Sequence, residues 1–223
     1  MMIVYLNYNF EGYSMPKNKK PPKVNKQEYL EVATEEEWPL WSARKGIDKD
    51  DFFRIVDFYV LHSPCRVSSY SPKKLEQYGW KNPWNSSRFR DAFDHIPGFK
   101  ENDNFWFHES KNHFLEMWEQ MGIKVFPECA GKEYAVFTYA GESNPRMDLL
   151  HHIRNAFAHG RFAVRNIKKE SYFYFEDVTE IRGIQGLFVV ARICLRKTTL
   201  IGWIDFFERK VDSAKCLSSL CEE

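Results

Sequence analysis

The sequence lacks the features that mark several common classes of protein. Its 32 Lys and Arg residues against 31 Asp and Glu residues give a net charge of +1, so no overall field draws the chain to nucleic acid or to an anionic membrane. Its five cysteines are scattered and include no CxxC pair, which argues against a disulfide framework and a zinc knuckle. Binding to a polyanion must therefore come from a local patch, and the cysteines are expected to be reduced thiols.

Long apolar runs are also missing. Residues 2–10 are apolar but short, and they have neither a basic leader nor a small-residue cleavage site, so they fail as a signal peptide. No later run approaches the ~20 apolar residues that a membrane-spanning helix needs. We therefore expect a cytoplasmic protein with no membrane segment.

Apolar side chains are nevertheless plentiful, because hydrophobic residues make up 43% and aromatic residues 17% of the 223-residue chain. A disordered protein carries far fewer. We expect a single domain over 28–223, with an irregular, proline-containing insertion around 63–100. The preceding segment 1–27 contains PKNKKPPKVNK and is predicted to be flexible, either a solvated linker or a basic arm that gathers RNA. Translation from Met1 or from Met15 fits the sequence equally well.

Hydrophobic periodicity predicts mostly helices, followed by a few strands. Four segments have apolar residues at helical spacing: 28–40, 50–61, 105–121 and 145–159. A short strand is expected over 134–139, and alternation over 172–178 and 187–195 predicts a β-hairpin. A last helix is expected to begin at Thr198 or Thr199. The predicted fold class is mainly α, a helical bundle with a small antiparallel β-hairpin followed by a C-terminal helix.

The helix predicted over 145–159 carries the residues best suited to chemistry. At ~100° per residue its apolar residues fall on one side: Leu149, Leu150, Ile153, Ala156 and Phe157. Its polar residues fall on the other side, which we expect to be exposed: Asp148, His151, His152, Asn155 and His159. Imidazoles that titrate near neutrality beside the permanently charged Arg154 are groups that phosphate chemistry uses. We therefore place the functional centre here.

Two other interpretations of this helix remain open. A His in the last turn before a terminating Gly is favoured by the helix dipole, and Arg154 would then be an ordinary surface residue. Zinc is the second alternative, because His152 and His159 are seven residues apart and could share a face. No HExxH or His-x-x-x-His pair exists and no Cys is nearby, so we predict no metal and no cofactor.

The stretch LHHIRNAFAHG, from Leu150 to Gly160, resembles the R-x4-6-H motif of the HEPN superfamily. Members commonly carry a polar residue directly after the Arg, and the hairpin and final helix resemble the C-terminal additions of some bacterial HEPN proteins. The resemblance implies a HEPN-like bundle and a metal-independent endoribonuclease of toxin, antiphage or RNA-processing systems, whose product carries a cyclic phosphate. It assigns three catalytic residues: His159 as general acid or base, Arg154 as phosphate clamp and Asn155 as the orienting amide. Three neighbours are candidates for substrate binding: His151, His152 and Arg161.

The spacing of the motif makes one copy an incomplete site. Arg154 and His159 are five residues apart, so on an ideal helix they point about 140° away from each other. Fraying at Gly160 would bring them together, as would two helices facing each other so that both motifs line one groove. The family implies the second arrangement, so we expect a homodimer that acts on RNA, with an antitoxin or regulatory protein as a further partner. The alternatives are a HEPN-like dimer that binds RNA or protein without cleaving, and a purely structural helical protein.

Overall fold

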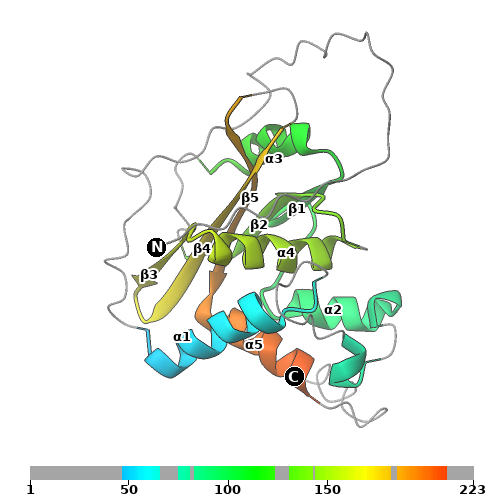
Figure 1. Cartoon of the computed structure of the whole chain (residues 1–223), viewed down its shortest axis with the longest axis vertical. Helices are drawn as coiled ribbons and strands as arrows, with labels where there is room; N and C mark the ends of the chain where they lie inside the picture. The colour runs from blue at the N-terminus through cyan, green and yellow to red at the C-terminus, as the bar shows by residue number, and fades with distance from the viewer. Residues whose placement is uncertain are drawn as a thin grey trace, which may run out of the picture.

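A five-stranded mixed sheet runs through the middle of the protein (Figure 1). The computed structural model describes residues 47–65, 75–80, 83–123, 131–142, 144–181 and 185–209. The strands are β1 (Phe105–His108), β2 (Tyr134–Thr138), β3 (Phe162–Ile167), β4 (Glu170–Glu180) and β5 (Leu187–Arg196), and their order in the sheet is β1-β2-β5-β4-β3. β1 and β2 are parallel, whereas the other neighbouring strands are antiparallel.

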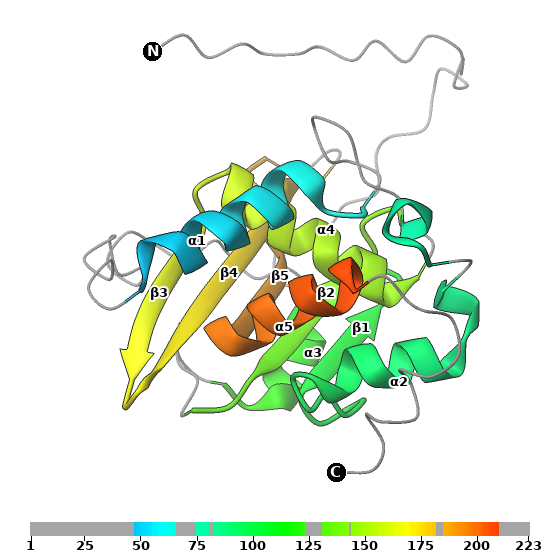
Figure 2. The ribbon, with the colours of Figure 1, turned by 90° about the horizontal axis from the view of Figure 1, so that it is seen from below.

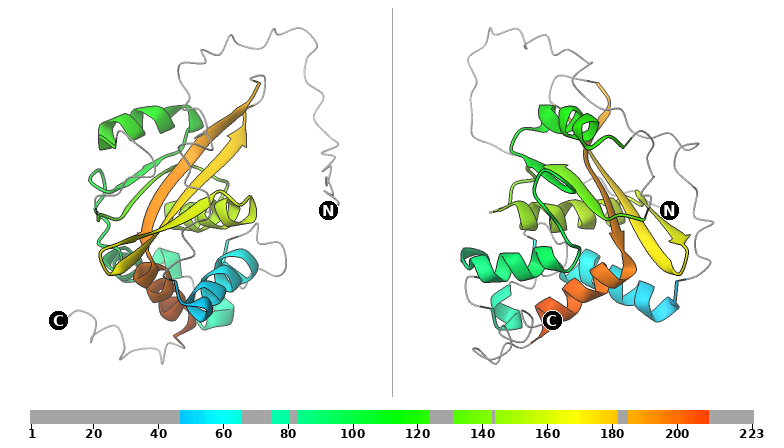
Figure 3. Two further views of the ribbon diagram at one scale, coloured as in Figure 1. Left: turned by 90° about the vertical axis from the view of Figure 1, so that its left-hand side faces the viewer. Right: turned by 180° about the vertical axis from the view of Figure 1, so that it is seen from behind.

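Helices cover both faces of this sheet. They are α1 (Lys49–Val56), α2 (Ser87–His95), α3 (Phe114–Met121), α4 (Pro145–Ala158) and α5 (Lys197–Glu208). α1 continues directly into a π-helical segment, η3 (Asp57–His62), and three short 3-10 turns complete the set: η4 (Leu75–Tyr78), η5 (Pro83–Asn85) and η6 (Lys111–His113). α3 and α4 lie on opposite faces of the sheet, and α1, α2 and α5 gather at one end of the molecule (Figures 2 and 3). No helix in the described ranges is long and apolar enough to cross a membrane.

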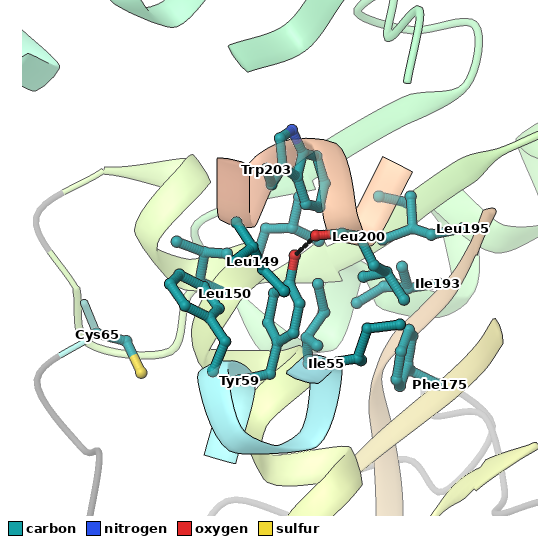
Figure 4. Packing of buried hydrophobic residues seen from close by; sticks show 14 of the residues in the cluster. Ile55, Tyr59, Cys65, Leu149, Leu150, Phe175, Ile193, Leu195, Leu200 and Trp203 are labelled. Atoms are coloured by element: carbon teal, nitrogen blue, oxygen red, sulfur yellow. Dashed lines mark hydrogen bonds between the residues drawn. The ribbon is translucent and has the colours of Figure 1, made fainter. Parts of the chain in front are cut away.

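Alternation along the strands divides the apolar side chains into two cores. Along β2, Ala135 and Phe137 face the larger core, which α4, α1, α5 and α2 complete, while Tyr134 and Val136 face a smaller core under α3. In the larger core the Tyr59 hydroxyl donates to the Leu200 carbonyl at 3.0 Å, which ties η3 to α5 (Figure 4). The sheet is therefore buried on both faces, an arrangement that a small surface hairpin does not require.

The predicted mainly helical class is wrong, and the protein is α/β. The β4–β5 hairpin exists but forms the centre of the sheet, where β2 pairs with β5 and β3 pairs with β4. The helix predicted over 105–121 is helical only from Lys111 onward, because Phe105 to His108 pair in parallel with β2 instead. That pairing overrides the helical spacing of a short aromatic run, since aromatic residues also suit strands. β3 was not predicted at all.

Other predicted elements are confirmed. The helix over 50–61 is present as α1 and η3, and the strand over 134–139 is present as β2. Within 63–100, the described residues form short helical pieces as predicted, and Trp80 and Phe89 are buried in the larger core; that this segment is an insertion stays a prediction. The last helix begins at Lys197 without a side-chain cap, so the predicted cap at Thr198 or Thr199 is wrong. The helix predicted over 28–40 and the basic segment 1–27 lie outside the described residues.

Candidate functional site

Local signals in the sequence fix the start of α4, the helix that carries the Arg154 to His159 motif. The Asn144 side chain accepts hydrogen bonds from the backbone N–H groups of Arg146 at 3.0 Å and Met147 at 3.1 Å. Pro145 occupies the first turn, where its missing N–H costs nothing. The helix therefore begins where the Asn-Pro pair predicts.

Gly160 fixes the other end of α4. Its φ of 67° lies in the left-handed region, and its N–H donates to the Phe157 carbonyl at 3.1 Å. The next N–H, that of Arg161, donates to the Ala156 carbonyl at 2.8 Å. These two bonds form a Schellman motif, which needs the conformation that glycine adopts without strain. His159 is thereby held as the C-terminal cap residue, with its side chain exposed.

Both faces of α4 are buried, because the helix contacts β2, β4 and η3. The predicted apolar face is confirmed, since Leu149, Leu150, Ile153 and Ala156 are all fully buried. The opposite face was predicted to be exposed, yet Asp148, His151 and His152 are only 1%, 7% and 2% exposed. The sheet covers this polar face, and each of its side chains therefore needs a partner inside the protein.

A continuous chain of hydrogen bonds runs along the polar face toward the C-terminal end of α4. His152 Nε2 lies 2.6 Å from the Thr138 carbonyl oxygen, and His152 Nδ1 lies 2.7 Å from Asp177 Oδ2. The same Asp177 oxygen accepts from Asn155 Nδ2 at 3.2 Å. Asn155 Oδ1 in turn accepts from Arg154 Nη1 at 2.9 Å. We call these five residues the polar chain; it connects the sheet to the guanidinium of Arg154.

The acceptors in the polar chain determine the direction of its hydrogen bonds. Both nitrogens of the His152 ring face oxygens that accept, namely a carbonyl and a carboxylate. The contact between His152 and Asp177 is buried, and it fixes Asp177 and through it the Asn155 amide. The amide oxygen that remains is the one that orients Arg154.

The motif residues differ in how far they reach solvent. Arg154 and Asn155 are half-buried on the last turn of α4, and His159 is exposed one turn later. Arg161, predicted as a substrate-binding candidate, pairs with the fully buried Glu176, which also pairs with Arg192 at 2.8 Å. The structure thus brings Arg154 and His159 to the same end of the helix and engages Arg161 in an internal ion pair.

A second polar cluster lies near the N-terminal end of α4. Asp148 Oδ1 accepts from the backbone N–H groups of Ala140 at 2.8 Å and Glu142 at 3.1 Å, which fixes the loop between β2 and α4. His151 Nδ1 lies 3.1 Å from Glu142 Oε1. His151 is therefore paired at this end of the helix and does not extend the Arg154 to His159 group.

Sequence reasoning missed Asp177, on which the polar chain depends. A usable signal was present, because Asp177 alternates in register with Phe173 and Phe175 on the strand predicted over 172–178. An acid at a core-facing strand position is costly unless it is paired, so it points to a buried basic or amide partner. The partners His152 and Asn155 lie on the helix packed across that face.

Comparison with protein-family models, with curated proteins and with solved structures gives no match for this chain. The described residues contain no group of three or more His, Cys, Asp or Glu side chains placed to hold a metal ion. The interpretation of the site therefore depends on the residues at the end of α4 themselves.

Proposed function

We propose that the protein is a metal-independent endoribonuclease of HEPN type, with Arg154 and His159 as its catalytic residues. The observation that carries the proposal is the polar chain, because it holds the Arg154 guanidinium in one orientation at the helix end that also presents the exposed His159. An ordinary surface arginine does not need a buried hydrogen-bond network behind it. The resemblance to the HEPN motif supports the same assignment, and it rests on this helix alone.

The proposed reaction is transfer of the RNA phosphate to the neighbouring 2′-hydroxyl. His159 removes the hydroxyl proton, the 2′-oxygen forms a bond to phosphorus, and the 5′-oxygen leaves with a proton from a general acid. Arg154 stabilises the negative charge that develops on the phosphate oxygens. The products are a 2′,3′-cyclic phosphate and a free 5′-hydroxyl. Asn155 acts as a positioning residue, since its amide is already bonded to Arg154 and Asp177.

Purified wild type, Arg154→Ala and His159→Ala test this proposal with structured RNA and a metal chelator. Matched controls are Arg88→Ala and His95→Ala, which remove exposed basic side chains from α2. We expect wild type and controls to cleave and to leave cyclic phosphate ends, and each motif variant to lose about a hundredfold or more. Inert wild type, or motif variants that remain folded and cleave as well as wild type, would contradict the proposal. Cleavage that the chelator abolishes would point instead to metal-dependent chemistry.

The proposal includes a homodimer, because a five-residue spacing would place Arg154 and His159 about 140° apart on an ideal helix, and two copies facing each other would line one groove. If each site takes Arg154 from one protomer and His159 from its partner, an equal mixture of Arg154→Ala and His159→Ala subunits regains about a quarter of wild-type activity. Half of the dimers are mixed, and each holds one intact site of two. No recovery after exchange of subunits would contradict a shared site.

A non-cleaving dimer that binds RNA or a protein partner is the second candidate. The observation that favours it is that Arg154 and Asn155 already bond to each other within the chain. Gel-shift titration of the same variants separates the two, since a pure binder loses affinity in Arg154→Ala without any cleaved product from wild type. An antitoxin or regulatory protein would be expected for an active enzyme. Cytoplasmic localisation is part of the proposal, because an RNA-cleaving enzyme of this type meets its cellular substrate in the cytoplasm.

A further inference from the structure

A pocket at the N-terminal end of α4 forms a second candidate site, at the opposite end of the helix from Arg154 and His159. Its volume of about 550 Å³ falls within the roughly 300–1,000 Å³ of small-molecule sites. Its walls come from β1 and the residue after it, from the loop that follows β2, and from the first turn of α4. The lining residues are Phe107, Glu109, Tyr139, Glu142, Asn144, Pro145 and Asp148.

The lining of the pocket is acidic. It contains three carboxylates, Glu109, Glu142 and Asp148, and none of the lining residues is Lys or Arg. His151 balances at most one of these charges through its contact with Glu142. Arg146 lies on the same turn, but its Nε donates to Asp94 on α2 at 3.0 Å, so Asp94 neutralises its positive charge. The field in the pocket therefore favours a cation.

Asp148 supplies the observation that points to a ligand. The residue is 1% exposed, and the two backbone N–H groups that bond to Oδ1 hold the carboxylate in place. Its other oxygen, Oδ2, is buried and has no hydrogen-bond partner among the described residues. An unpaired buried carboxylate oxygen is costly, so a donor that reaches it is bound favourably. Asp148 lines the same pocket as Glu109 and Tyr139, whose side chains are exposed at its wall.

The kind of cation follows from the walls. The described residues hold no group of three or more acidic, His or Cys side chains placed for a metal ion, so the carboxylates are not arranged around a single small ion. Phe107, Tyr139 and Pro145 add apolar surface, and aromatic faces attract ammonium groups. We propose that the pocket binds an organic primary ammonium ion on an apolar body. The ammonium donates to Asp148 Oδ2, and the body packs on Phe107 and Tyr139.

Calorimetric titration of the full chain with 2-phenylethylammonium and with its neutral analogue 2-phenylethanol tests the proposal. We expect the ammonium to bind at least about tenfold more tightly than the alcohol, and Asp148→Asn to weaken ammonium binding about ten- to a hundredfold. The Asn oxygen still accepts from the loop N–H groups, so this variant keeps the contacts that shape the pocket. Glu119→Gln, which removes an exposed carboxylate on α3 outside the pocket, should leave the dissociation constant unchanged.

Three results would overturn the proposal: equal affinity for ammonium and alcohol, no binding at millimolar ammonium, or wild-type affinity in folded Asp148→Asn. If Asp148→Asn does not fold, exposed Glu109→Gln takes its place, and undiminished ammonium binding there would count against the site. A third titration with Nα-acetyl-lysine methylamide distinguishes the source of the ammonium. If Nα-acetyl-lysine methylamide binds more tightly than 2-phenylethylammonium, the natural ligand is a lysine side chain of a protein. If it binds more weakly, the natural ligand is a small-molecule amine. Both results support an ammonium site. None of these measurements depends on RNA cleavage.

Discussion

Replacing Asp177 tests whether the polar chain positions Arg154. The Asp177 side chain is 6% exposed; Oδ2 faces His152 and Asn155, and Oδ1 accepts from the Val178 N–H at 2.9 Å. Asp177→Ala leaves all three donors without this acceptor in a site closed to water. Removing one partner of a buried acid–base contact of this kind costs about 3–5 kcal/mol, a large part of the ~5–15 kcal/mol by which a typical domain is stable. We expect the free energy of unfolding to fall by that amount.

Asp177→Asn separates the hydrogen bonds from the charge. The amide oxygen still accepts from the Val178 N–H, while an NH2 group replaces Oδ2. His152 tolerates this donor, because the neutral ring accepts at Nδ1 and still donates from Nε2. Asn155 does not, since two amide NH2 groups then face each other. If Asn155 turns its amide to offer oxygen, it removes the acceptor that orients Arg154. We expect a smaller stability loss, about 1–3 kcal/mol, together with a released Arg154.

Urea unfolding followed by tryptophan fluorescence measures the first effect, and RNA cleavage by folded protein measures the second. Misplacement of a catalytic group by about 1 Å can cost about a hundredfold in rate, so we expect a loss of that size in Asp177→Asn. Glu180→Ala removes an exposed carboxylate at the end of the same strand and should change stability by no more than about 0.5 kcal/mol. The reasoning is refuted if Asp177→Ala costs less than about 1 kcal/mol, or if Asp177→Asn cleaves as well as an active wild type.

Three further predictions concern the frame around the site. Gly160→Ala should lower the free energy of unfolding by about 1–2 kcal/mol because φ is 67°, and Gly160→Asn should lose less; equal melting temperatures for all three proteins would contradict this. Trp203→Ala, which removes a fully buried ring stacked on Phe93 at 4.4 Å, should cost about 3–5 kcal/mol in urea unfolding, whereas exposed Phe53→Ala should cost about 0.5 kcal/mol or less. Burial raises the pKa of Tyr78 from 10.0 to about 12, so the folded state keeps the phenol proton to a higher pH than the unfolded state does. The stability that this difference provides is complete below pH 10 and is lost as the pH rises toward 12. The melting temperature of Tyr78→Phe should therefore depend less on pH between pH 10 and 12.

Helix α4 was predictable because the signals that define it are local. Asn144 and Pro145 start it, Gly160 ends it, and each acts through bonds to residues within the neighbouring turn. The apolar face was equally readable from spacing alone. These interactions do not depend on where the rest of the chain lies, so one sequence is enough to predict them.

The edge strands were not predictable by the same means. β1 and β3 are short, with four and six residues, and each gains its structure from a partner strand. β1 pairs with a strand more than twenty residues away, and Ala135 of that strand pairs with Ile193. Phe105 to Phe107 fit a helix by spacing and a strand by residue type, and the available edge of β2 decides between them. Local patterns carry no information about that edge.

The exposure of the polar face could not be predicted for a related reason. A helical wheel separates the faces of α4 correctly but does not show that the sheet covers the polar one. Asp177 carried the missing information, because its register on the predicted strand placed a carboxylate among Phe173 and Phe175. A prediction that paired the core-facing Asp177 with the polar face of the predicted helix would have placed both the acid and that face in the interior.

Burial of its polar face explains why α4 presents candidate sites at its two ends and not along its length. In the middle of the helix, His152 and Asn155 find partners on the sheet, and such satisfied groups serve to fix structure. At the N-terminal end the sheet no longer provides a donor for Asp148 Oδ2, and the carboxylate lines a pocket. At the C-terminal end the polar chain reaches Arg154, and the glycine cap presents His159 to solvent. Ligands are expected where a fixed polar array meets solvent, because the polar groups there are already oriented and binding does not have to order them.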